Sequence, residues 1–213
     1  VRAQDLLYRA GTATGGQLRA SGWTSPFLPA AQVEAYAQDL ASTLATKSQD
    51  ALGLLKQHLM RGLPGLVKGL THTGIPVLEN ESAAQTMISS TERIRVETPA
   101  ERVLSVTLAI ADAKDLMADL GRIFAELQED SWYKAIVLAS DDPEFLFAVP
   151  DDVVLHAQRL IVESNIPVVA ALPRNAKGSA WLIAQFCDAC VYSQDGVYSS
   201  ANIRPALTQT AAA

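Results

Sequence analysis

AALPRNAKGSAWLIAQFCDACVYS, residues 170–193, holds the pattern that decides the fold. It begins inside an apolar strand, passes through a turn that contains Arg174, Asn175 and Lys177, and continues from Gly178 into an apolar helix. A second apolar strand, ACVYS, follows that helix. A strand, a helix and another strand in this order predict two parallel strands joined by a right-handed crossover.

The same alternation extends back to residue 91. RIRVET, RVLSVTLAI and YKAIVLAS have the composition and patterning of strands, and DAKDLMADLGRIFAELQED, between the last two, is an amphipathic helix. A strand ends within DPEFLFAVPDD, and the helix DDVVLHAQRLIVES and the strand IPVVAAL follow. The pattern therefore predicts an α/β fold on a buried, largely parallel sheet.

The first part of the chain has a different pattern. PAAQVEAYAQDLASTLATK and SQDALGLLKQHLMRGL repeat apolar residues at helical spacing, with Ser48 as the N-cap of the second helix. That helix places Leu52 and Leu55 on one face, with Lys56 away from it. The sequence thus predicts a helical part over 1–72, a linker over 73–90 and an α/β part over 91–213.

Composition excludes several classes of function. The net charge of -6 and the absence of a basic cluster argue against a nucleic-acid partner. No apolar run reaches the roughly 18 residues that span a bilayer, and VRAQDLLYRAG has no signal-peptide pattern. We therefore expect no membrane partner and a cytoplasmic location.

Cys187 and Cys190 form a CxxC pair, a spacing used in redox and metal sites. The chain has no second cysteine pair, and His72 and His156 are remote in the sequence. We therefore expect no metal site, and we favour two buried thiols between a helix and a strand.

Two turns are candidates for a site that binds a negative oxygen. One precedes Gly178, and the other lies within 142–152. Each follows a strand of one parallel sheet, so both are expected at its carboxyl edge, where α/β proteins place their sites. Backbone N–H groups at a helix start point outward unpaired and favour negative charge, as an oxyanion hole requires.

These segments resemble the first half of the crotonase (enoyl-CoA hydratase/isomerase) superfamily. The family pattern is a strand like VVLTG, then FCAGAD, then KPVIAAxxGxAxGGG and a Cys-Asp pair. The residues that match it are Phe147, Asp152, Pro167, Ala170, Ala171, Ala176, Gly178, Cys187 and Asp188. The resemblance implies a crotonase-like ββα superhelix.

The first seventy residues resemble the other half of the same family, in swapped order. QDLLYRAGTATGGQLRASGWTSPFLP and the helices after it are similar to the part that follows in crotonases, an all-helical part that serves trimerisation and covers a neighbouring active site. The resemblance implies a homotrimer. The chain is either circularly permuted, or it joins the tail of one crotonase unit to the head of another; the sequence leaves both open.

The resemblance also implies roles for single residues. The two N–H groups that hold a thioester enolate fall on Val149 and Ser179. The acid-base glutamates of hydratases fall on Leu182 and Asn202, so the paired-carboxylate route to hydration is absent. Asn202 and the LKQHL helix are more similar to decarboxylases of polyketide β-branching, in which His58 would protonate the dienolate; a solvated helix residue is an equal alternative for His58.

The implied substrate is an acyl thioester of phosphopantetheine or CoA, with no bound cofactor. Lys177 and Arg174 would attract its phosphate or a carboxylate, although solvated turn residues are the slightly favoured alternative. The partner would be an acyl carrier protein or acyl-CoA. The chemistry would be decarboxylation or isomerisation of an enoyl thioester, and the alternative is a catalytically inactive scaffolding or interaction domain.

Overall fold

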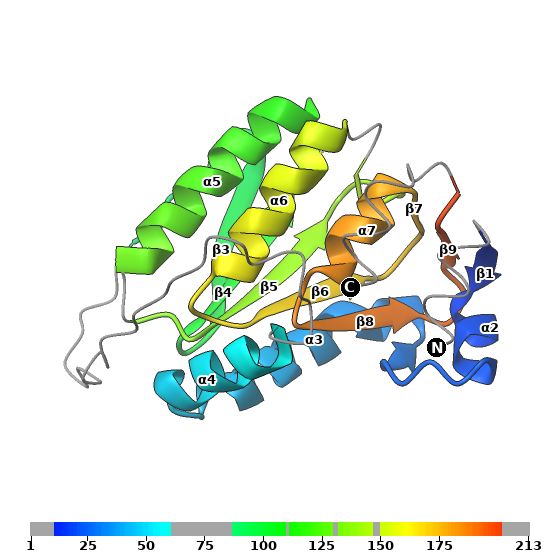
Figure 1. Ribbon diagram of the computed structural model, residues 1–213, viewed down its shortest axis with the longest axis horizontal. Coiled ribbons are helices and arrows are strands. Elements are labelled where there is room, and N and C mark those ends of the chain that lie inside the picture. The colour runs from blue at the N-terminus through cyan, green and yellow to red at the C-terminus, as the bar shows by residue number, and fades with distance from the viewer. Residues whose placement is uncertain (1–10, 61–86, 110, 130–131, 147–149, 202–213) are drawn as a thin grey trace.

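The computed structural model describes residues 11–60, 87–109, 111–129, 132–146 and 150–201 (Figure 1). Within these ranges the chain forms a mixed α/β structure with one large and one small sheet. The α/β prediction is confirmed.

The large sheet has the strand order β2-β8-β6-β5-β4-β3. All neighbours in it pair in parallel, except that β3 runs antiparallel to β4. The strands are β2 (Phe27–Leu28), β3 (Ile94–Ala100), β4 (Val103–Leu108), β5 (Ala135–Ser140), β6 (Val168–Leu172) and β8 (Ala189–Ser193). β4, β5 and β6 are buried at every residue, which explains their continuous apolar runs.

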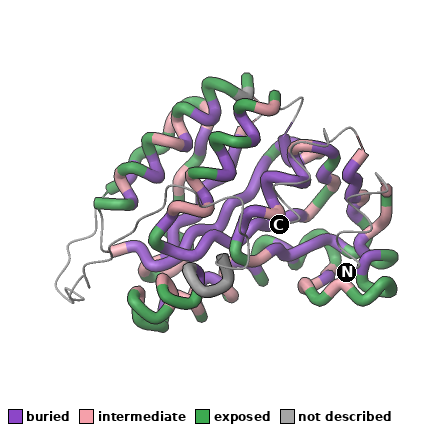
Figure 2. Tube along the Cα trace, viewed as in Figure 1, coloured by how far each residue is buried: buried purple, intermediate pink, exposed green. Residues whose placement is uncertain are grey.

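Helices cover both faces of this sheet (Figure 1). One core joins α5 (Ala113–Glu129), α6 (Asp151–Glu163) and α7 (Ser179–Gln185) to one face of the sheet. The opposite face packs against α3 (Ala30–Ala45), which presents small residues at helical spacing. Figure 2 shows the resulting buried layer between exposed helix surfaces. Since α3, from the part predicted to be helical, packs on the sheet of the α/β part, the two predicted parts are joined by a hydrophobic core.

The small sheet corrects part of the prediction for the first seventy residues. It has the order β1-β9-β7, with β1 (Thr12–Thr14), β9 (Val197–Ser199) and β7 (Ala176–Lys177). β1 and, in the large sheet, β2 are strands in a part predicted to be all-helical, and they are three and two residues long, too short for a periodic pattern. α2 (Gly15–Ala20) follows β1, with Thr14 and Gln17 forming a capping box.

α4 (Gln49–Met60) is anchored by a lysine rather than by leucines. Ser48 accepts from the Ala51 N–H, as the predicted N-cap requires. Leu55 is 54% exposed, whereas Lys56 is buried. The predicted orientation of this helix is therefore wrong: the Lys56 side chain turns inward because it finds a carboxylate and backbone carbonyls there.

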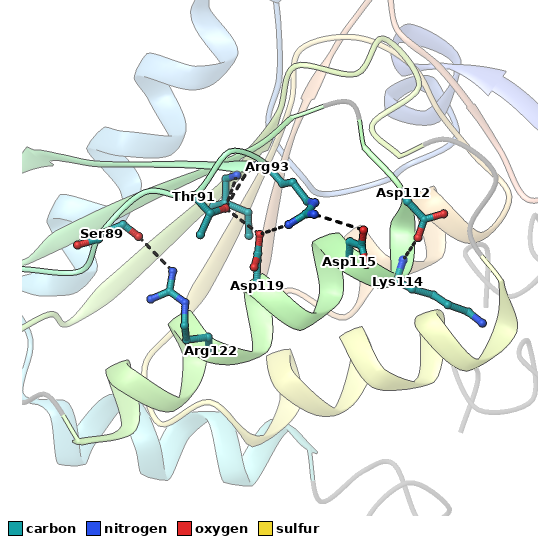
Figure 3. A network of polar contacts seen from close by, with 9 residues as sticks. Ser89, Thr91, Arg93, Asp112, Lys114, Asp115, Asp119 and Arg122 are labelled. Carbon is teal, nitrogen blue, oxygen red and sulfur yellow. Dashed lines mark hydrogen bonds and ion pairs between the residues drawn. The ribbon is translucent and has the colours of Figure 1, made fainter.

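The segment before β3 is fixed to α5 by a polar network (Figure 3). Arg93 lies 3.3 Å from a carboxylate oxygen of both Asp115 and Asp119, and the Thr91 hydroxyl donates to Asp119 over 2.8 Å. Arg122 donates to the Ser89 carbonyl. These contacts hold the antiparallel edge of the sheet against the helix layer.

Candidate active site

The candidate site lies at the edge where the parallel strands end. β5 ends at Ser140, and residues 141–146 form turns and bends after it, although the sequence predicted a strand that ends within residues 142–152. β6 ends at Leu172, and residues 173–175 lead from it into β7. Because β5 and β6 are paired neighbours, these two segments leave the sheet side by side.

A glycine with a left-handed backbone connects β7 to α7. Gly178 has φ +57° and ψ -130°, and a Cβ at this position would lie 3.1 Å from the Ala201 carbonyl oxygen. Its N–H donates to the Ser199 carbonyl over 2.7 Å. The turn into α7 therefore depends on a residue without a side chain.

Ser179, the predicted oxyanion donor, is the first residue of α7 and is half-buried. The first N–H groups of a helix lack partners within the helix. Among the described residues, the Ser179 N–H donates to no acceptor. It is thus available to a negative oxygen. Val149, the second predicted donor, lies outside the described residues.

Both predicted phosphate-binding side chains lie at this edge, and both are already engaged. The Lys177 ammonium is 3.1 Å from Glu144 Oε1, and Arg174 donates to the Asp141 carbonyl over 3.1 Å. Each side chain therefore binds the segment after β5 and also adds positive charge to this edge. Both side chains remain partly accessible to solvent.

Asn175 and Glu144 were not predicted as site residues. The Asn175 amide donates to Glu144 Oε1 over 3.2 Å, and its carbonyl oxygen accepts from the Val197 N–H over 2.9 Å. Its backbone N–H donates to the Pro143 carbonyl over 3.1 Å. Asparagine in a turn is a frequent local pattern, so only the long-range partners reveal its role.

The residue at the position that corresponds, by the resemblance, to a hydratase glutamate is apolar and buried. Leu182 is fully buried within α7 and packs in the core beneath the turn. It can neither donate nor accept a proton. Asn202, the other such position, lies outside the described residues.

The structure does not bring His58 to Ser179 within one chain. His58 follows Lys56 by two residues in α4, and the Lys56 ammonium binds the Ile161 carbonyl and Asp188. Asp188 immediately precedes β8, at the edge where the parallel strands begin. Ser179 lies at the opposite edge, where the parallel strands end, and a five-residue strand spans roughly 13 Å between the two edges. Of His58, the structure describes only the backbone.

The two cysteines are buried and free, as the sequence analysis favoured. Desolvation is the main reason that the pKa of the Cys187 thiol is raised, and it raises the pKa of Cys190 to about 12. The Cys190 thiol also donates to the Ala184 carbonyl over 3.0 Å. Both thiols stay protonated at neutral pH, so they are poor nucleophiles. Within the described ranges, no cluster of His, Cys, Asp and Glu could hold a metal ion.

Comparison with known proteins gives structural neighbours alone. No family model and no curated protein matches the sequence. Among solved structures, the chain is similar to a probable enoyl-CoA hydratase/isomerase from Mycobacterium abscessus, with 21% identity over 49% of this chain and 47% of that one and a TM-score of 0.42.

Two further similar structures are an enzyme involved in polyketide β-branching and a decarboxylase domain from Lyngbya majuscula. One belongs to a dehydratase/decarboxylase enzyme couple, with 20% identity over 50% of this chain and 51% of that one and a TM-score of 0.44. The other is the ECH2 decarboxylase domain of CurF, with 18% identity over 50% of each chain and a TM-score of 0.42. The chain spans about half the length of these structures. Separately, no helix in the described residues is long and apolar enough to cross a bilayer.

Proposed function

We propose that the chain is a crotonase-like domain of a polyketide assembly line that acts on a carrier-bound enoyl thioester. The reaction would be decarboxylation or isomerisation through an enolate held by the N–H groups of Val149 and Ser179. The observation that carries the proposal is the Ser179 N–H, which starts a helix at the carboxyl edge and has no acceptor among the described residues.

The chemistry needs little more than stabilisation of charge on one oxygen. In decarboxylation, the bond between the carboxylate carbon and the acyl chain breaks, and its electron pair delocalises onto the thioester oxygen as CO2 leaves. Two N–H donors at that oxygen lower the barrier, because the negative charge appears there only as the bond breaks. A proton then restores the thioester.

His58 enters the proposal as the proton donor from a second copy of the chain. Within one chain, Lys56 anchors α4 at the opposite edge of the sheet from Ser179. A homotrimer in which the helical part of one copy covers the site of its neighbour would remove that separation. An imidazole with a neutral-range pKa suits the transfer.

The acyl group would arrive on the phosphopantetheine arm of an acyl carrier protein or on CoA. Lys177 and Arg174 would steer the phosphate, since both lie at the same edge as Ser179 and keep exposed surface. Their existing bonds to Glu144 and Asp141 limit this contribution to long-range attraction.

The test is to incubate the purified protein with a carrier protein loaded with 3-methylglutaconyl thioester, and to follow the mass of the intact carrier. Loss of CO2 faster than in a protein-free control supports the proposal. Circular dichroism first establishes that the protein is folded. An unchanged carrier mass with folded protein contradicts decarboxylation, and an unchanged double-bond position by NMR then contradicts isomerisation.

A catalytically inactive scaffold is the second candidate. The observation that favours it is Leu182, which fills a hydratase acid-base position with a fully buried apolar side chain. A scaffold has no open oxyanion site, so an acyl-pantetheine thioester should leave its melting temperature unchanged. A functional site should be stabilised as ligand occupancy increases.

A further inference from the structure

β3 is the last strand of the large sheet, and within the described ranges its outer side pairs with no other strand. In an antiparallel pair, alternate residues direct their backbone N–H and C=O groups away from the partner strand. In β3 these residues are Ile94 and Val96, since both bond to the segment that precedes the strand. A row of such groups is a template on which another strand can pair.

Two hydroxyl groups occupy this row. The Ser90 hydroxyl accepts from the Val96 N–H over 2.9 Å and donates to the Val96 carbonyl over 3.4 Å. The Thr91 hydroxyl accepts from the Ile94 N–H over 3.0 Å, and the Thr91 N–H donates to the Ile94 carbonyl over 2.8 Å. Residues 89–91, here called the strap, therefore lie where a further strand would pair.

The strap is fixed to α5 as well as to β3. Figure 3 shows Arg122 reaching the Ser89 carbonyl and the Thr91 hydroxyl reaching Asp119, at 3.3 and 2.8 Å. These contacts are polar and involve side chains at the surface of the helix layer. Because no β-ladder holds the strap in place, its cover of the edge depends on two hydroxyl side chains.

The side chains of β3 are complementary to those of a second copy of the same strand. If two copies lie antiparallel about Val96, Arg95 of each copy is directly opposite Glu97 of the other. Both side chains are exposed, at 53% and 61%. Opposite charges at directly opposed positions stabilise a strand pair, and a two-fold axis makes both contacts identical. Within one chain, Arg95 is shared between Glu97 and Asp141.

The part of the edge that can pair coincides with the part that the strap covers. Beyond Glu97 the register of β3 against β4 shifts before Ala100. Pro99, between them, has no N–H group to donate. Pairing of two β3 strands is therefore centred on Val96, whose N–H and C=O groups both bond to Ser90.

We propose that the outer side of β3 is a self-association surface for β3 of a second copy, and that the hydroxyls of Ser90 and Thr91 block it. This inference concerns the antiparallel edge of the sheet and does not depend on the proposed function. Loss of the two hydroxyls leaves the backbone groups of Ile94 and Val96 without these partners, and pairing with a second copy satisfies them again.

The first test compares the double variant S90A/T91V with S90T/T91S, which keeps both hydroxyls. Circular dichroism establishes that each is folded, and sedimentation equilibrium measures the weight-average mass. We expect the mass of S90A/T91V to rise with protein concentration to about twice that of the wild type, as a two-fold contact requires. S90T/T91S should match the wild type at every concentration.

Amide hydrogen exchange locates the contact. In S90A/T91V at low concentration, the Ile94 and Val96 amides should exchange faster than in the wild type, because their acceptors are gone. At high concentration their protection should return, since the partner strand then supplies the acceptors.

A charge reversal tests the register. In the S90A/T91V background, Glu97→Arg places two arginines opposite each other and should abolish the association. Glu101→Arg makes the same change of charge in the turn after β3, at a side chain that is 78% exposed, and should leave it intact.

Three results would overturn the proposal. One is a folded S90A/T91V that exchanges the two amides faster and keeps the wild-type mass. The others are association that E97R leaves unchanged, or that E97R and E101R weaken equally. If S90A/T91V does not fold, Ser90→Ala alone frees Val96 at the centre of the pairing and is judged by the same measurements.

Discussion

The two edges of the large sheet are stabilised by different kinds of polar contact, one buried and the other partly exposed. At the amino edge, one buried ion pair between Lys56 and Asp188 is surrounded by backbone groups of Ile161 and Val168. At the carboxyl edge, several partly exposed side chains link neighbouring segments, among them Arg95 of β3 with Asp141 after β5. This difference indicates that contacts at the amino edge contribute more to the free energy of unfolding, whereas those at the carboxyl edge position groups that solvent or a ligand can reach.

The largest effect is expected from removing one partner of the buried pair. Asp188→Ala leaves the Lys56 ammonium buried without its carboxylate, and such unpaired charges cost about 3–5 kcal/mol. Urea denaturation should show this loss in the free energy of unfolding. Asp39→Ala, at an exposed position of α3, is the control and should change it by less than about 0.5 kcal/mol. Equal effects of the two substitutions would contradict the contrast between the edges.

Alkaline pH should weaken the amino edge through Cys190. The folded pKa is raised from 9.0 to about 12, so below pH 9 both states hold the proton and stability is fully present. Between pH 9 and 12 the unfolded chain loses the proton first, and the free energy of unfolding falls by up to about 1.4 kcal/mol per pH unit.

Denaturation under reducing conditions at pH 8, 9 and 10 measures this slope. Cys190→Ala is the control variant, and it should be less sensitive to alkaline pH than the wild type. The same dependence on pH in both proteins would show that other groups, such as the buried tyrosines, cause the loss.

A smaller effect is expected at the glycine before α7. Gly178→Ala places a Cβ on a residue with φ +57°, near the Ala201 carbonyl, and should destabilise the fold by about 1–2 kcal/mol. Gly53→Ala is the matched substitution, because a Cβ there meets nothing within 4 Å and the site is inside α4. It should stabilise the protein by about 0.5–1 kcal/mol. Thermal melts of both variants give opposite shifts if the turn requires glycine.

The smallest effect is expected at the exposed ion pair. Arg95→Ala removes contacts between side chains that are 53% and 51% exposed, so it should cost at most about 1 kcal/mol, decreasing as salt is added. Unfolding in low and high salt provides the measurement. A loss as large as that of Asp188→Ala would mean that the carboxyl edge also carries stability.

The α/β part could be predicted because its signals are local. Continuous apolar runs mark strands buried on both faces, and the pattern of 112–130 predicts α5 almost to the residue. β1 and β2 could not be predicted, since such short strands exist only through partners near the other end of the chain. Lys56 was misplaced for the same reason: its carboxylate lies 132 residues away.

The sequence predicted which turn forms the candidate site, but not the contacts that the side chains of that turn make. Arg174, Asn175, Lys177 and Gly178 are evident in the sequence, and the structure confirms the glycine turn into a helix. The sequence favoured neither Asn175 nor Glu144, because their role comes from where two separate turns meet. The resemblance assigned a role to His58, but the anchoring of α4 depends on tertiary contacts that periodicity does not contain.

The pairing of β1 with β9 has a consequence for how the chain folds during synthesis. Thr12 leaves the ribosome 187 residues before Ser199, whose hydroxyl it contacts at 2.7 Å. β2 likewise waits for β8, and the small-residue face of α3 waits for the sheet that covers it. These elements are thus made well before the partners that complete them, which predicts slow folding and an apolar surface that stays exposed until those partners are synthesised.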